Sequence, residues 1–244
     1  MMKWVKNAPQ FDHVFFVNMG ITSAQKDELK AAARVRQLRL TLHNASASYM
    51  PRHALNFEPM NTGFKAIAME HMLKHDYFDS CHVVWWADAS IRFTKRFNIS
   101  SAEQRPHPTW GVKVHHNGYI NHMWTHPSMY AYFGLKQADD SGWSVNGGTV
   151  AFNLHNQQAR ELLRLWAECN RNRECIVPTG SERWPPRLGL STHRHASSLY
   201  FAHRDDQAAL NLALLLLFGS KVLGQQLTLN LHKLPFIIER NSIC

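Results

Sequence analysis

The chain has 244 residues, of which 45% are hydrophobic and 18% charged, a composition that excludes a disordered or low-complexity protein. This length is enough for one large α/β domain or two small ones, and we expect a single domain over residues 1–244. The formal net charge of +9 fits partners such as nucleic acid, anionic membranes or phosphate-bearing molecules. Lysine and arginine are scattered along the chain without a dense run, which favours a solvated basic face and gives no expectation of a nucleic-acid partner.

Residues 1–7 lack the continuous apolar core of a secretory leader, and the apolar stretch 210–218 is too short to cross a bilayer. We therefore expect neither a signal peptide nor a membrane anchor in this sequence. The four cysteines do not decide the compartment. Cys169 and Cys175 bracket a short loop, so that a local disulfide is geometrically possible.

The first part of the chain predicts a strand, a helix and a second strand. Residues 13–20 form a short apolar run that ends at Gly20. Thr22 and Gln25 have the spacing of a capping box for a helix over residues 23–34. Alternating polar and apolar residues over 35–42 indicate a half-buried strand, and the order strand–helix–strand favours a parallel sheet with a right-handed crossover. Residues 43–61 are polar and predict a loop.

The next unit ends on the stretch around which we expect the fold to be organised. Thr62 precedes a predicted helix over residues 63–75, and Val83–Ala87 is an apolar run without alternation, typical of a strand buried on both faces of a sheet. The run ends on Asp88. Ligands commonly bind at the carboxyl end of such strands, although Asp88 by itself fits the cap of a turn or helix equally well.

The second half contains two further informative stretches. Asn146, Gly147 and Gly148 precede a predicted strand over residues 149–152, and Asn156 is placed to cap a helix that extends to Cys169. Residues 207–218 predict a helix that is apolar nearly all round and therefore buried. The chain as a whole predicts an α/β fold with a mostly parallel central sheet flanked by helices, in which Val83–Ala87 is the central strand.

Taken together, three stretches resemble the nucleotide-diphospho-sugar transferase superfamily, whose members have the Rossmann-like glycosyltransferase type A fold. They are Trp86-Ala87-Asp88-Ala89-Ser90, Asn146-Gly147-Gly148 and Asp206-Gln207 with Leu210-Asn211. The first is similar to a metazoan galactosyltransferase-like group with a Trp-x-Asp-Ala-Ser strand, and the last to glycosyltransferase family eight. Such enzymes end the strand in Asp-x-Asp, whereas Ser90 stands here in place of the second acid. The chain also begins shortly before its first predicted strand, so the base-binding strand that opens this fold is expected to be missing.

The resemblance implies transfer of a sugar from a nucleotide-sugar donor, a UDP-sugar, to a glycan or glycoprotein acceptor in the Golgi or secretory lumen. It assigns catalytic roles to Asp206, Gln207 and Asn146. It assigns donor binding to Lys65, Asp88, Ser90, Arg92, Gly147 and Gly148. Mn²⁺ or Mg²⁺ would bind Asp88, with His232 as a further ligand, and the serine at position 90 would weaken that site. A Cys169–Cys175 bridge is also expected.

Two other functions stay open at the level of the sequence. A catalytically inactive domain of the same fold would bind a glycan or a protein, and Ser90 and the short N-terminus favour this alternative. A basic nucleic-acid-binding protein is the second alternative, supported only by net charge, since the aromatic residues lie in apolar runs and not among basic residues.

Overall fold

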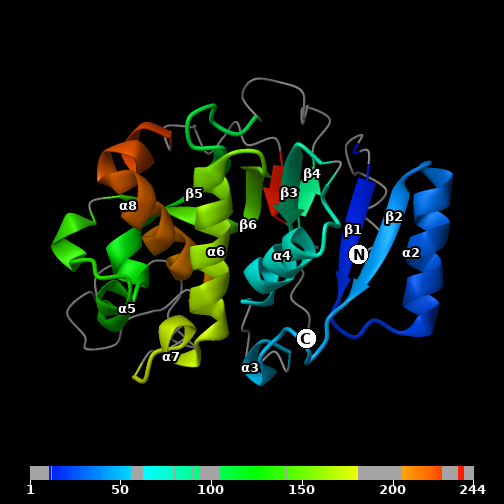
Figure 1. The fold of residues 1–244 in the computed structure, drawn as a ribbon, viewed down its shortest axis with the longest axis horizontal. Helices are drawn as coiled ribbons and strands as arrows, with labels where there is room; N and C mark the ends of the chain where they lie inside the picture. Colours follow the sequence, from blue (N-terminus) through cyan, green and yellow to red (C-terminus); the bar gives the residue numbers. More distant parts are fainter. Residues whose placement is uncertain are drawn as a thin grey trace.

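The computed structural model describes residues 11, 13–55, 63–79, 81–88, 91–93, 105–140, 142–180, 205–226 and 236–238 (Figure 1). The elements are β1 (His13–Asn18), α2 (Ser23–Val35), β2 (Arg39–Asn44), α3 (Arg52–Leu55), α4 (Phe64–Lys74), β3 (Val83–Ala87), β4 (Ile91–Phe93), β5 (Val112–Ile120), α5 (Pro127–Tyr132), β6 (Trp143–Asn153), α6 (Gln157–Arg171), α7 (Arg173–Ile176), α8 (Asp205–Gln226) and β7 (Phe236–Ile238). Two short 3₁₀ helices flank α5, at Asn121–Trp124 and Gln137–Asp139. No helix in these ranges is both long and apolar enough to span a membrane.

The predicted strand–helix–strand unit is confirmed. β1 and β2 are parallel neighbours, and α2 packs beside β2 at one end of the molecule (Figure 1). The capping box is present: the Thr22 hydroxyl accepts a hydrogen bond from the Gln25 backbone N–H, and the Gln25 side chain accepts one from the Thr22 N–H. The second strand begins at Arg39 and not at residue 35, because α2 continues to Val35 and the chain then reverses through Gln37, whose φ is 54°.

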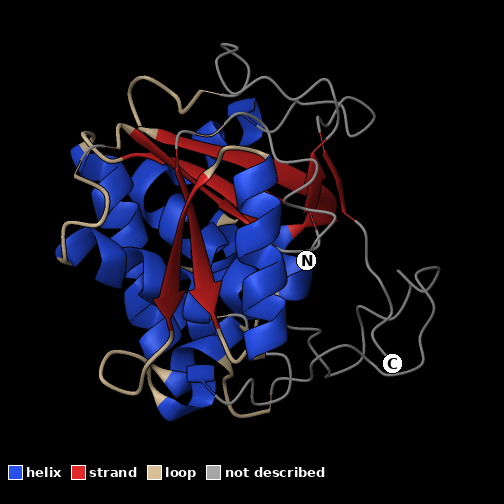
Figure 2. Cartoon of the chain, turned by 90° about the vertical axis from the view of Figure 1, so that its right-hand side faces the viewer, coloured by secondary structure: helices blue, strands red, loops and turns tan. Residues whose placement is uncertain are grey.

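The predicted α/β class is confirmed, but the described residues do not show a mostly parallel central sheet. The largest sheet has three strands in the order β3-β6-β5, and both of its pairings are antiparallel. β4 and β7 form another antiparallel pair, and Figure 2 shows the strands of the separate sheets running in different directions. The architecture is therefore mixed α/β with small sheets.

The prediction that Val83–Ala87 is a central strand buried on both faces is also wrong. β3 has the predicted bounds, yet it lies at the edge of its sheet, Val83 is 38% exposed, and Trp85 and Trp86 are only partly buried. A continuous apolar run indicates that side chains cover the strand, but it carries no information about which strand pairs with each edge. The partner of β3 is β6, which follows about sixty residues later.

Three helices form the layer that holds the sheet β3-β6-β5 in place. α6 lies between α4 and α8 (Figure 1), and its Trp166 is fully buried and stacked against Phe152 of β6. Asn156 caps α6 as predicted, because its side chain accepts hydrogen bonds from two N–H groups of the first turn. The buried apolar helix predicted over residues 207–218 is the first part of α8, and Gly219, with φ 73°, interrupts the helical geometry where the prediction ends it.

The predicted disulfide is present. Cys169 in α6 and Cys175 in α7 are bonded, with their Cα atoms 5.3 Å apart, and both are fully buried. Asn172 between them caps α7 by accepting a hydrogen bond from the Glu174 N–H. The bridge therefore fixes the turn between the two helices at the end of the core.

Replacing Cys175 by serine should lower the free energy of unfolding by about 2 kcal/mol, the loop-entropy contribution of a ring this short. Denaturant unfolding followed by tryptophan fluorescence measures the change. The control is Cys81→Ser, which replaces a cysteine outside the Cys169–Cys175 bridge and should leave that bridge intact. If reduction with dithiothreitol lowers the stability of Cys175→Ser as much as that of the wild type, the stabilising role of this bridge is contradicted.

A cluster of aromatic and imidazole rings joins β2 to α4. Tyr49 stacks on His71 with ring centroids 3.8 Å apart and shares a 2.9 Å hydrogen bond with His43 Nε2. His75 and Tyr77 lie against the same group. Burial lowers the pKa of both His43 and His71, and the neighbouring His75 lowers each further. The folded protein therefore resists protonation of these two rings.

Stability should fall as the pH drops below about 6.5, because the unfolded chain then binds protons at these rings that the folded chain does not. The double variant His43→Gln/His71→Gln should show a shallower fall between about pH 7.5 and pH 5.5 in urea unfolding. The exposed His155→Gln is the control and should follow the wild type. Equal slopes for the double variant and the wild type would contradict this origin of the pH dependence.

Candidate functional site

A buried lysine joins two aspartates that come from distant parts of the chain. Lys65 Nζ lies 3.0 Å from Asp88 Oδ2 and 2.9 Å from Asp206 Oδ2. It also donates a longer hydrogen bond, 3.5 Å, to the carbonyl oxygen of Gly147. The side chains of Lys65 and Asp206 are 5% and 10% exposed, and that of Asp88 is 29% exposed. Lys65, Asp88 and Asp206 are called the charged cluster below.

Each residue of the charged cluster lies at one end of a helix or strand, which fixes the position of its side chain. Asp88 directly follows β3, and its N–H donates to the Gly148 carbonyl at 2.9 Å, which extends the pairing with β6 by one residue. Lys65 is in the first turn of α4. Asp206 is in the first turn of α8, where its carbonyl oxygen accepts a 2.8 Å hydrogen bond from Trp166 Nε1 of α6. The helical layer and the edge strand therefore meet at this point.

Gly147 and Gly148 make room for the two carboxylates. A Cβ atom on Gly147 would lie 3.1 Å from Asp206 Oδ2, and one on Gly148 would lie 3.1 Å from Asp88 Oδ2. Such distances are shorter than ordinary van der Waals contact, so a larger residue would push the acids away. Both glycines lie inside β6, whereas the sequence predicted them ahead of the strand. Glycine within a strand commonly marks a close approach of this kind.

The predicted catalytic side chains Asn146 and Gln207 both form hydrogen bonds with groups of β6. The Asn146 Oδ1 atom accepts a 2.8 Å hydrogen bond from the Gly148 N–H, which shapes the strand beside Asp88. Gln207 Nε2 donates to the Ser144 hydroxyl at 2.7 Å. These contacts support β6 and the start of α8. Catalytic roles for Asn146 and Gln207 stay predictions.

The remaining predicted residues add no side-chain geometry. Ser90 and His232 lie outside the described residues. Arg92 is in β4, where it is paired with Ile237 of β7, and its side chain is not described.

The charge balance of the cluster is uneven, since two carboxylates share one ammonium. Burial by itself would lower the pKa of Lys65, but the charges of Asp206 and Asp88 and the hydrogen bonds to them outweigh it and raise that pKa. Burial raises the pKa of Asp88, and the Asp206 charge adds to this, although Lys65 and the Trp86 N–H act in the opposite direction. Lys65 is therefore cationic at neutral pH. The pKa of Asp88 is raised above its ordinary value, because one ammonium does not fully offset burial and the neighbouring Asp206 charge.

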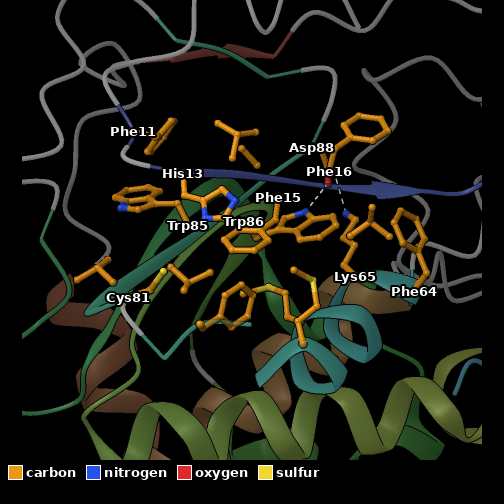
Figure 3. A pocket seen from close by; sticks show the side chains of 18 of the residues that line it. Phe11, His13, Phe15, Phe16, Phe64, Lys65, Cys81, Trp85, Trp86 and Asp88 are labelled. Atoms are coloured by element: carbon orange, nitrogen blue, oxygen red, sulfur yellow. Dashed lines mark hydrogen bonds and ion pairs between the residues drawn. The ribbon is translucent and has the colours of Figure 1, made fainter. Parts of the chain in front are cut away.

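An aromatic-lined cavity of about 310 Å³ opens beside the charged cluster, between β1, β3 and α4 (Figure 3). Consecutive residues of both strands line it, 13–17 and 83–88. Because successive side chains of a strand point to opposite faces, a lining of consecutive residues means that strand edges border the cavity. Lys65 and Asp88 form its polar end (Figure 3), and they are the members of the predicted site that line it. Asp88, Asn146 and Asp206 therefore lie close together, but of these three residues Asp88 alone lines the cavity.

The expected Mn²⁺ or Mg²⁺ ion has to be weighed against the donor atoms that are present. In the ranges that the structure describes, no group of three or more His, Cys, Asp or Glu side chains is placed to hold a metal ion. Lys65 Nζ lies between the oxygens of Asp88 and Asp206, and the other Asp88 oxygen accepts a 2.7 Å hydrogen bond from Trp86 Nε1. This arrangement does not fit a divalent ion while the ammonium is in place. A metal at Asp88 stays a prediction.

Three residues that hold the site together have no role assigned from the sequence, although two of them lie in the quoted motifs: Trp86, Ser144 and Asn211. Trp86 had a usable signal, because residues two apart on a strand share a face and Asp88 is two residues further on. Asn211 lies one turn after Gln207 on α8 and is fully buried. Its Oδ1 atom accepts a 2.8 Å hydrogen bond from the Val145 N–H, and its Nδ2 donates to the Gln207 carbonyl. A buried amide in an apolar helix was the available signal for this residue.

Comparisons of the chain with models of protein families, with curated proteins and with solved structures find no match. The function therefore has to be argued from the charged cluster and the cavity beside it.

Replacing Asn211 by leucine should lower the free energy of unfolding by about 2–3 kcal/mol, because the buried Val145 N–H loses its acceptor. Chemical unfolding measures this loss. Leu216→Ala is the control: it is on the same helix but 43% exposed, and it should change the stability by about 0.5 kcal/mol or less. Equal effects of the two substitutions would contradict the role of Asn211 in holding β6 to α8.

Proposed function

We propose that the chain is a glycosyltransferase domain that binds a nucleotide sugar, a UDP-sugar, and transfers the sugar to a glycan or glycoprotein acceptor. The observation that carries the proposal is the convergence of Asp88, Asp206 and the Gly147–Gly148 backbone on Lys65, beside an aromatic-lined cavity. These are the three stretches on which the resemblance to nucleotide-diphospho-sugar transferases depends. They are separated by more than fifty residues each and meet at one point.

The chemistry of the cluster suits a ligand with a ring and many hydroxyl groups. The cavity offers aromatic surface from Phe64 and Trp86, on which a flat ring would pack. Asp88 at its end accepts hydrogen bonds from sugar hydroxyls, and Lys65 holds this carboxylate in place. In this proposal Asp206, Gln207 and Asn146 act on the sugar or the acceptor, as the resemblance implies.

The disulfide supports the compartment that goes with this proposal. Disulfides persist in oxidising compartments and are rare in the cytosol, so the buried Cys169–Cys175 bridge favours the secretory lumen. A glycan or glycoprotein acceptor and a Golgi location are parts of the same proposal.

A catalytically inactive binding domain is the second candidate, and one observation favours it. Both oxygens of Asp88 already have partners, Lys65 and Trp86, so the acid is tightly held in the absence of a ligand. A domain of this kind would bind the nucleotide sugar or a glycan without transferring the sugar.

A thermal-shift panel of UDP-glucose, UDP-galactose and UDP-N-acetylglucosamine, each with and without Mn²⁺, tests the proposal, because a ligand that binds the native state stabilises it. At least one donor should raise the melting temperature and be turned over to UDP in the presence of a mixed glycan acceptor. Asp88→Asn should weaken donor binding about tenfold or more and reduce turnover about a hundredfold or more. The exposed Asp79→Asn is the matched control and should behave as the wild type.

Each outcome of this panel has a defined meaning. Donor binding without turnover would transfer the assignment to the inactive binding domain. Stabilisation by none of the donors would contradict the transferase and a nucleotide-sugar-binding domain, and salt-sensitive binding to DNA in the same preparation would then favour the nucleic-acid alternative.

A further inference from the structure

We propose that Asp88 and Asp206 form a cation site whose resident cation is the ammonium group of Lys65, so that the site takes up a divalent cation only when that ammonium is removed. This inference concerns the same side chains as the proposed transferase, but it goes beyond sugar transfer and does not depend on it. It assigns to Lys65 the charge-neutralising role that a metal ion fills in an Asp-x-Asp site.

The three donors of the ammonium match three oxygen acceptors. Lys65 Nζ lies within 3.0 Å of one oxygen of Asp88 and one of Asp206, and it donates a third, longer hydrogen bond to the Gly147 carbonyl. An ammonium has three donors and no acceptor, so this set satisfies it completely. The oxygens converge on one buried atom, as they would around a metal ion.

The spacing suits the ammonium and not a metal ion. Mg²⁺ holds about six oxygens at roughly 2.0–2.1 Å, and it keeps several of its waters. The oxygens around Lys65 stand about 3 Å or more from the central atom. The second oxygen of Asp88 accepts the Trp86 N–H and is directed away from this centre. A divalent ion would need both a closer approach and the departure of the ammonium.

The lysine is held in place by its surroundings. Lys65 is in the first turn of α4 and is only 4% exposed, with the hydrophobic residues Ala66 and Ile67 after it fully buried. Leaving the site would place the charged end in the neighbouring cavity, whose lining is mostly aromatic and aliphatic. The ammonium therefore has no competing polar environment of similar quality among the described residues.

Terbium luminescence tests this inference directly. Tb³⁺ occupies oxygen sites of the kind that take divalent metals, and it emits when a nearby tryptophan is excited. Trp86 touches Asp88 and would act as the sensitiser. The wild type should give no saturable emission beyond that of Asp88→Asn. Lys65→Met, which keeps the apolar stem and removes the charge, should give saturable emission with an affinity for Tb³⁺ at least tenfold higher than the wild type.

Two further variants locate the signal. Lys65→Met/Asp88→Asn should lose the gained affinity at least tenfold, because one of the two carboxylates is then neutral. Lys74→Met removes a lysine from the same helix whose side chain is 64% exposed, and it should resemble the wild type. Mn²⁺ should raise the melting temperature of Lys65→Met and leave that of the wild type unchanged.

Three results would overturn the inference: saturable Tb³⁺ emission from the wild type that Asp88→Asn abolishes, a folded Lys65→Met that binds no ion, or equal gains for Lys65→Met and Lys74→Met. If Lys65→Met is folded only when Mn²⁺ is present, the result supports the inference. If it does not fold under either condition, the wild type decides: no emission beyond Asp88→Asn supports the built-in cation, and emission that depends on Asp88 overturns it. None of these readouts involves sugar transfer, so a failure of the proposed function would leave them unchanged.

Discussion

The described structure depends on one interaction, the contact of the buried Lys65 ammonium with the carboxylates of Asp88 and Asp206. The contact joins the start of α4, the end of β3 and the start of α8, three places that are far apart in the sequence. Removing one partner of a buried ion pair costs about 3–5 kcal/mol, since the other charge is left without compensation. Here two acids depend on a single cation, so the loss of Lys65 would leave both uncompensated. The same contact fixes the polar end of the aromatic cavity.

Two adjacent glycines destabilise β6 locally and leave space for the two carboxylates. Glycine in the middle of a strand weakens it, because it has more conformational freedom to lose and no side chain to pack. Gly147 and Gly148 nevertheless lie inside β6, where their missing Cβ atoms leave space for the oxygens of Asp206 and Asp88. The weakening is offset by two side-chain acceptors: Asn146 Oδ1 accepts a hydrogen bond from the Gly148 N–H, and Asn211 Oδ1 accepts one from the Val145 N–H. In this part of β6 the close approach of the carboxylates is therefore kept at the expense of the strand's own stability.

The sequence predicted the parts of the fold that depend on neighbours along the chain. The capping box at Thr22, the cap at Asn156 and the short disulfide loop are local, and each was found as predicted. Sheet order depends on contacts between distant segments, and the apolar run Val83–Ala87 did not reveal its edge position or its antiparallel partner. Asp88 at the end of a strand and Asp206 at the start of a helix lie where local sequence patterns place them. The bridging by Lys65 could not be predicted, because a position in a helix does not say where a long side chain ends.

The most direct test is the titration of Lys65 itself, observed by NMR of protein labelled with ¹³C at the lysine ε carbon and assigned with Lys65→Met. The carboxylates of Asp206 and Asp88 raise the pKa of Lys65 above the usual 10.5. We expect the Lys65 signal to keep the chemical shift of its protonated form at the pH where the exposed lysines are half titrated. A Lys65 signal that titrates with the exposed lysines or below them would contradict the account.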